Sequence, residues 1–255
     1  MKYGLVSISF RSLSCEEIIK ITKASGLDCI EWGGDVHVPP DNAENAARVA
    51  SLTKEAGLTV SAYGSYYKAG TYGDDYKEIF GKILDTAVIL GAPIIRIWAG
   101  TEASGTISEE KRAKITAECA AIARMAAEKN ITVAFECHRN TLTDDYTSSL
   151  RLMGETAQSN LKMFWQPNET RDHTYNLKAA EELLPFITNV HVFNWPRPDC
   201  REPLADGAEN WKKYLSVIAR DGGQHCCCLE FMPDDKPETL AREAAVLKNI
   251  LKNNK

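Results

Sequence analysis

The chain has no excess of positive charge and no long hydrophobic run. Its 255 residues include 30 Lys and Arg against 35 Asp and Glu, which gives a formal net charge of −5. Proteins that bind nucleic acids or anionic membranes usually carry a basic surface, so we expect neither as a partner. No apolar stretch approaches the roughly 18 residues that a membrane-spanning helix needs. We therefore expect no transmembrane segment.

Several short motifs are also missing. The sequence contains no GxGxxG, no GxxxxGK[ST] and no CxxC, which argues against an open nucleotide-binding sheet and against a structural zinc site. Residues 1–7 lack the apolar segment of a secretory signal and predict a first strand instead, so we expect a cytoplasmic protein. Three of the eight cysteines are consecutive, at 226–228, which is poor geometry for disulfides. Reduced, structural cysteines are the expectation.

Short β-rich runs alternate with longer amphipathic stretches along the whole chain. Gly26, Gly57 and Gly91 each stand just after a predicted helix, where glycine commonly forms the C-terminal cap. The predicted strands are residues 4–10, 29–32, 59–63, 94–98, 132–137, 162–165, 190–194 and 226–231. The predicted helices are residues 16–24, 43–56, 76–90, 109–128, 146–158, 179–186, 211–219 and 237–251.

Polar residues recur at the ends of the predicted strands. They are separated by 32, 33, 40, 30, 25 and 39 positions: Glu31, Tyr63, Arg96, Glu136, Gln166, His191 and Glu230. Seven strand ends of this kind, together with a first strand, make an eight-unit barrel of about 250 residues. No linker rich in Pro, Gly or Ser divides the chain. The sequence therefore predicts a single (β/α)8 TIM barrel of class α/β over residues 1–255, with the active site at the C-terminal ends of the strands.

Two carboxylates, an imidazole and an amide end four successive predicted strands. Glu136 and Glu230 each close an apolar run, His191 lies between two valines, and Gln166 follows a tryptophan. Each alone fits a structural role, but a barrel brings all four to one opening, the mouth of the barrel. Unpaired carboxylates there would repel each other and lose hydration, and a divalent cation removes that cost. We predict that these four residues bind Mn²⁺, Mg²⁺, Co²⁺ or Zn²⁺.

This order of ligands resembles that of the sugar phosphate isomerase/epimerase family. Three further segments also resemble that family, at residues 30–40, 63–67 and 96–100. The resemblance spans essentially the whole chain. These xylose isomerase-like barrels include ketose 3-epimerases, inosose isomerases and dehydratases, hydroxypyruvate isomerase and, more distantly, endonuclease IV. The family usually has Asp on strand six. Gln166 keeps an oxygen ligand there but removes one negative charge, which leaves open a barrel that binds a sugar without catalysis.

The resemblance implies that Glu136 and Glu230 bind the metal and form an acid/base pair on opposite faces of the substrate. Removal of a proton next to a carbonyl gives an enediolate, which a metal ion stabilises. Return of the proton to the opposite face epimerises the carbon, and its delivery to the neighbouring carbon isomerises the substrate. The expected activity is a metal-dependent isomerase or epimerase of a sugar, sugar phosphate or keto-polyol. The alternatives are a dehydratase of an inosose-like keto-polyol on the same site and an inactive sugar-binding barrel.

Other residues near the predicted strand ends are candidates for binding a small carbohydrate substrate. Arg96, if buried, needs an acidic partner, and Glu31 and Glu136 are nearest in strand order. Two loop arginines are candidates to hold a phosphate or carboxylate. The candidates are Glu31, His37, Arg96, Trp98, His138, Arg197 and Arg201.

Aromatic side chains are candidates for the walls of the mouth, with core packing as the alternative: Trp32, Tyr66, Trp98 and Trp195. An endonuclease-like activity is disfavoured, because such sites use many histidines and this chain has five. Members of the family are often oligomeric, so a homo-oligomer is a further expectation.

Overall fold

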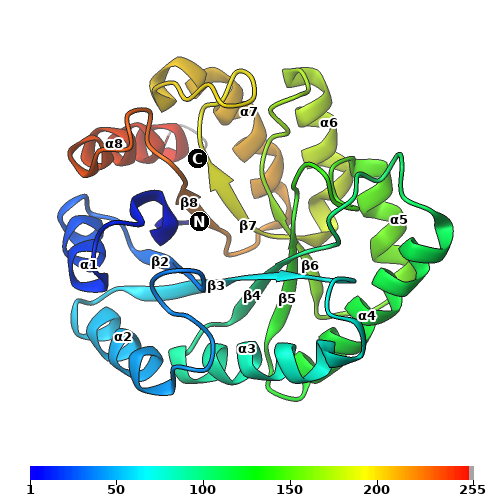
Figure 1. Cartoon of the computed structure of the whole chain (residues 1–255). Coiled ribbons are helices and arrows are strands. Elements are labelled where there is room, and N and C mark those ends of the chain that lie inside the picture. The colour runs from blue at the N-terminus through cyan, green and yellow to red at the C-terminus, as the bar shows by residue number, and fades with distance from the viewer. Residues whose placement is uncertain (253–255) are drawn as a thin grey trace.

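Eight short, buried runs of the chain pair side by side to form the central sheet. The computed structural model describes residues 1–252, and its strands follow one another in chain order around a closed parallel barrel, which the pairing of the first with the last completes (Figure 1). Parallel strands that are covered on both faces are nearly continuous in apolar residues. The strands are β1 (Lys2–Val6), β2 (Cys29–Gly33), β3 (Thr59–Lys68), β4 (Ile94–Trp98), β5 (Thr132–Glu136), β6 (Leu161–Trp165), β7 (Ile187–Val192) and β8 (Cys226–Leu229).

The helices form the outer ring (Figure 1). Local signals fix their ends: Ser14 and Glu17 form a reciprocal capping box at the first helix, and Gly91, with φ of 71°, ends the third in the left-handed conformation, as glycine does at little steric cost. The predicted (β/α)8 barrel is confirmed. The helices are α1 (Cys15–Ala24), α2 (Ala43–Glu55), α3 (Tyr76–Leu90), α4 (Glu109–Ala127), α5 (Tyr146–Thr156), α6 (His173–Leu183), α7 (Ala208–Ile218) and α8 (Leu240–Lys252).

The three largest differences from the sequence-based boundaries are in β1, β3 and α6. The first strand stops at Val6, and Ser7–Phe10 form a 3-10 turn that lies over the end of the barrel. β3 continues beyond residue 63 to Lys68 through a register shift. α6 begins at His173, six residues early, because the Asp172 side chain accepts a hydrogen bond from the Tyr175 backbone N–H and caps the helix. The capping contact between residues 172 and 175 is one that hydrophobic periodicity does not reveal.

The interior of the barrel carries an apolar layer beneath its C-terminal end. Ile94, Ala134 and Phe164 pack together there with Ala62. Side chains two residues apart on a strand point to the same face, so Arg96 and Glu136 stand one layer above this cluster. The apolar layer therefore forms a floor for the polar groups at the mouth.

The eight cysteines are all free, and five of them are buried, as expected for structural thiols. Among residues 1–252, no helix combines the length and apolar character that crossing a membrane would require.

Candidate active site

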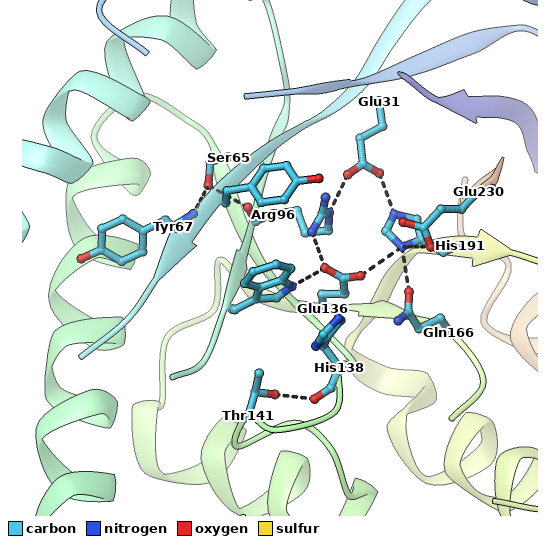
Figure 2. Close-up of polar contacts among 12 residues, drawn as sticks. Glu31, Ser65, Tyr67, Arg96, Glu136, His138, Thr141, Gln166, His191 and Glu230 are labelled. Atoms are coloured by element: carbon cyan, nitrogen blue, oxygen red, sulfur yellow. Dashed lines mark hydrogen bonds and ion pairs between the residues drawn. The ribbon is translucent and has the colours of Figure 1, made fainter. Parts of the chain in front are cut away.

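Six polar side chains from six different strands meet inside the C-terminal end of the barrel (Figure 2). Five of them are at least 95% buried, with only the amide partly exposed. Burial of so many polar and charged groups requires mutual hydrogen bonds and charge pairing. The six are Glu31 on β2, Arg96 on β4, Glu136 on β5, Gln166 after β6, His191 on β7 and Glu230 after β8.

Arg96 connects two of the carboxylates. Its Nε donates to Glu31 Oε1 at 2.5 Å and its Nη1 donates to Glu136 Oε2, so both expected acidic partners are present. Trp98 Nε1 also donates to Glu136 Oε2. These contacts occupy one oxygen of Glu136 and leave Oε1 directed toward His191 (Figure 2).

His191 is the centre of the remaining contacts. Its Nε2 lies 2.9 Å from Glu31 Oε2, and its Nδ1 lies 2.8 Å from Gln166 Oε1. The same Nδ1 is 3.5 Å from Glu230 Oε2 and 3.6 Å from Glu136 Oε1. A carboxylate that accepts from one ring nitrogen fixes the direction of the other, so Glu31 orients Nδ1 toward the mouth.

The four predicted ligands fit a divalent cation. Glu136, His191 and Glu230 each offer one donor atom within 4.8 Å of the other two, and Gln166 adds an oxygen. Ions such as Zn²⁺ and Mg²⁺ hold ligands at about 2.1 Å, which places neighbouring ligands about 3.0 to 3.4 Å apart. The distances of 2.8, 3.5 and 3.6 Å from His191 Nδ1 to the three oxygens lie within about 0.2 Å of that range. His191 would bind as the neutral imidazole with its proton on Nε2.

The pKa values of the Glu136 and Glu230 carboxyl groups are shifted in opposite directions. Burial alone would raise the pKa of Glu136, but the Arg96 guanidinium and the His191 imidazole hold it well below its usual range. The pKa of Glu230 is raised, chiefly by burial and also by the nearby charge of Glu136. Two carboxylates whose environments push their pKa values apart suit different roles in acid/base chemistry. Glu136 is held as a carboxylate, whereas Glu230 is suited to accept and return a proton.

His191 predicts a loss of stability at alkaline pH for the metal-free protein. Burial by itself would lower its pKa, but the carboxylates of Glu230, Glu31 and Glu136 raise it to about 10. A raised pKa stabilises the fold below the unfolded value of about 6.5, and this contribution disappears as the pH rises toward 10. Urea unfolding of chelated protein should show a decrease of a few kcal/mol across this window. His191→Gln should flatten that decrease, and an unchanged slope in the variant would contradict the assignment.

Gly64 on β3 leaves the space that the Arg96–Glu31 pair occupies. A Cβ at position 64 would lie 2.6 Å from Arg96 Nη2 and 2.8 Å from Glu31 Oε1. Gly64→Ala should therefore displace a buried ion pair and destabilise the fold by about 1 to 3 kcal/mol. Gly154→Ala on α5 is the control, because a Cβ there meets nothing within 4 Å and alanine favours a helix by about 0.5 to 1 kcal/mol. Thermal unfolding of both variants checks the prediction, and equal effects would contradict it.

A cavity of about 210 Å³ opens above these residues. Trp98, Tyr66 and Trp195 line it, as expected for aromatic walls. The His138 ring lies against Trp98 with a centroid separation of 4.9 Å, and its Nδ1 contacts the Arg139 backbone carbonyl at 2.8 Å. His138 is thus placed beside the mouth, where the sequence had suggested it for substrate binding.

Other predicted site residues lie elsewhere. The Glu31 side chain is fully buried behind the mouth, where it pairs with Arg96 and His191. His37, predicted to bind substrate, is buried with its ring against Trp32, and its Nε2 lies 3.1 Å from the Leu13 carbonyl. Trp32 is also a core residue, and its Nε1 donates to Thr53 Oγ1.

The two loop arginines are not equivalent. Arg197 is exposed, forms an isolated bridge with Cys200 and does not belong to the lining of the mouth cavity. Arg201 lies over the rings of Phe231 and Trp195, with its Cζ 4.4 and 5.4 Å from the two centroids, and pairs with Asp235. It stands behind the rim of the cavity rather than in its lining.

The sequence missed several residues that line the mouth. They lie in loops whose paths periodicity does not fix, although Arg11, a polar residue directly after the first predicted strand, carried the same signal as the other strand ends. The residues missed are Ile8, Arg11, Arg139, Glu169, Phe193 and Phe231.

Residues 19–250 match the model of a family described as xylose isomerase-like TIM barrel. A 3-dehydroshikimate dehydratase of Bacillus anthracis is 25% identical over an alignment of 280 residues, which covers 98% of this chain and 97% of the relative. A crystal structure of a probable 3-DHS dehydratase from Bacillus anthracis superposes with a TM-score of 0.82 at 25% identity, covering 98% of this chain and 99% of the other. An L-ribulose 3-epimerase structure gives 0.77 at 17% identity, covering 99% and 95%.

Proposed function

Because this chain belongs to the xylose isomerase-like TIM barrel family, we propose that it removes a proton next to the carbonyl of a hydroxy-ketone, sugar or keto-polyol with the help of a divalent metal ion. The first candidate activity is that of an isomerase or epimerase, in which the proton returns to carbon. The observation that carries the proposal is the convergence of Glu136, Glu230 and Gln166 oxygens on His191 Nδ1.

The side chains of the site have different roles in the proposed reaction. Glu136, Gln166, His191 and Glu230 would hold the metal ion, which when bound polarises the substrate oxygens and stabilises the negative charge that develops on them. Arg96 keeps Glu136 charged and fixed, and Glu31 keeps the His191 ring in place. The site is thus organised before substrate enters, which lowers the cost of reorganisation during the reaction.

Glu230 is the group we assign to move the proton. Its carboxylate lines the mouth cavity, and in the metal-free protein burial raises its pKa. A side chain positioned in this way can act in general acid–base catalysis. Glu136 would serve as its partner on the other face of the substrate. Return of the proton to the opposite face of the same carbon would give an epimer. Its delivery to the neighbouring carbon would give an isomer.

A second candidate is dehydration, in which the same proton abstraction is followed by loss of a β-hydroxyl group as water. It is supported by the relative named as a 3-dehydroshikimate dehydratase, which aligns with nearly the whole length of this chain. A cyclic keto-polyol or keto acid is the corresponding substrate. The two candidates share Glu230 as base and differ in which bond breaks next.

Proton exchange tests the proposal. The metal-reconstituted protein is incubated in D₂O with free ketoses, sugar phosphates, keto-inositols and 3-dehydroshikimate, and products are followed by NMR and mass spectrometry. A product that carries deuterium next to a carbonyl and has lost no water identifies an isomerase or epimerase. A product that has lost one water identifies a dehydratase. Either reaction should stop on chelation. Absence of exchange with every metal and substrate would contradict the proposal and favour a barrel that only binds.

A further inference from the structure

Two guanidinium groups that the proposed proton chemistry does not use line the mouth, those of Arg11 and Arg139. Arg11 follows the 3-10 turn after β1 and lines the same cavity as Glu230 and Gln166. From the contacts described below, we infer that Arg11 anchors an anionic group of the substrate, so that the substrate is a carboxylate or phosphate ester rather than a neutral ketose. This inference rests on the proposed function and specifies its substrate class.

Three contacts hold the Arg11 side chain in place. Its Nε donates to Asp35 Oδ2 at 3.0 Å, its Nη2 donates to the Tyr66 hydroxyl at 2.7 Å, and its Nη1 donates to the Ile8 carbonyl at 3.4 Å. The guanidinium also lies 5.8 Å from the centroid of the Phe231 ring. A guanidinium has five N–H groups, so two remain without a partner among the described residues.

Two strained residues hold Arg11 in this position. Tyr66 and Phe231 have φ values of 59° and 50°, in the left-handed region that bulky residues rarely occupy. The remaining non-glycine residues of positive φ, among those described, are Asp, Asn and one Ala. Strain of this kind persists only where surrounding contacts enforce it, and it concentrates at functional sites. Both strained aromatic residues line the mouth and contact the same arginine.

A fixed guanidinium with free N–H groups is suited to an anion. Its planar donors match the oxygens of a carboxylate or phosphate, and each charged hydrogen bond is stronger than a neutral one. Arg139 also lines the mouth, but it lies between the carboxylates of Glu169 and Asp199, at 3.5 and 3.7 Å. Arg11 has a single carboxylate partner, Asp35, and its other contacts are with a hydroxyl and a carbonyl oxygen.

Matched pairs of ligands test the anchor in the unchanged protein. Binding of shikimate is compared with binding of methyl shikimate, and fructose 6-phosphate with fructose, by calorimetry of metal-loaded protein. We expect the anionic member of at least one pair to bind about 10- to 100-fold more tightly. A larger preference in the first pair identifies a carboxylate substrate, and in the second a phosphate ester. Equal affinity within both pairs would overturn the inference, whatever any variant does.

Variants then locate the effect. Arg11→Gln should abolish the preference for the anion and leave the affinity for the neutral member within about twofold, whereas Arg11→Lys should retain part of it. Arg48→Gln is the control, because Arg48 is exposed on α2 and pairs with Glu16, and it should retain the full preference. Circular dichroism verifies that each variant is folded. A full preference in folded Arg11→Gln would overturn the assignment to Arg11.

Failure of this inference can be told from failure of the proposed function. If wild-type protein exchanges protons in a neutral ketose as fast as in its phosphate ester, and Arg11→Gln exchanges protons in that ester at the wild-type rate, the anchor is wrong and the proton chemistry stands. If anions bind through Arg11 but no keto compound exchanges protons, the anchor stands and the proposed reaction is wrong.

Discussion

Glu230→Gln should lower the rate of proton exchange by about 10²- to 10⁴-fold, the usual contribution of a general base. The amide keeps the shape of the side chain and an oxygen 3.5 Å from His191 Nδ1, but it cannot accept the substrate proton. The variant should fold, since it removes one buried charge whose pKa the surroundings already raise. Exchange measured in D₂O with the best substrate of the panel checks this result.

A matched control separates catalysis from a general loss of charge. Glu238 lies exposed in the 3-10 turn before α8, and Glu238→Gln should exchange at the wild-type rate. Metal content of Glu230→Gln, measured by atomic emission, identifies how much of the loss reflects metal release. A variant that retains both its metal and the wild-type rate would exclude Glu230 as the base.

Arg96→Met should destabilise the protein by about 3 to 5 kcal/mol, the usual cost of removing one partner of a buried ion pair. Arg96 is 2% exposed and lies between two buried carboxylates, Glu31 and Glu136. Burial would raise the pKa of Glu31, and the guanidinium together with His191 holds it below its usual range. Without the Arg96 guanidinium, the buried negative charges of Glu31 and Glu136 would be less well compensated. The free energy of urea unfolding at pH 7 measures this effect.

Two further variants make the result specific. Arg48→Met removes an exposed cation whose side chain is 46% accessible, and it should cost less than about 1 kcal/mol. Glu31→Gln added to Arg96→Met should recover part of the stability, because it removes one of the uncompensated charges. A loss below about 1 kcal/mol in Arg96→Met, or a further loss in the double variant, would contradict this account of the site.

The register of the strands explains why much of the site could be predicted. Apolar runs that end in a single polar residue mark the C-terminal ends of parallel strands, and alternation along a strand sends residues two apart to the same face. The amino-acid pattern alone therefore identifies Glu136 and Glu230 as groups that face the mouth. The same pattern predicted that Arg96 needs Glu31 or Glu136, and it contacts both.

Loop residues could not be placed in the same way. His37 and Arg197 both follow strands closely enough to reach the mouth. The His37 ring instead contacts the Leu13 carbonyl, and the Arg197 side chain is exposed to solvent. Arg11 follows the turn at residues 7–10 and donates to the hydroxyl of Tyr66, whose φ is positive. Neither feature is visible in the sequence pattern.

By itself, then, the sequence determined the barrel and the four groups that face one another at the mouth, because hydrophobic periodicity fixes which side of a strand each residue occupies. The tertiary structure decided that Glu31 orients His191 and that Gly64 leaves room for Arg96. It also decided that Arg11 lines the mouth cavity and that Arg197 and Arg201 do not. These features depend on contacts between segments far apart in the chain, and no local pattern of residues encodes such distances.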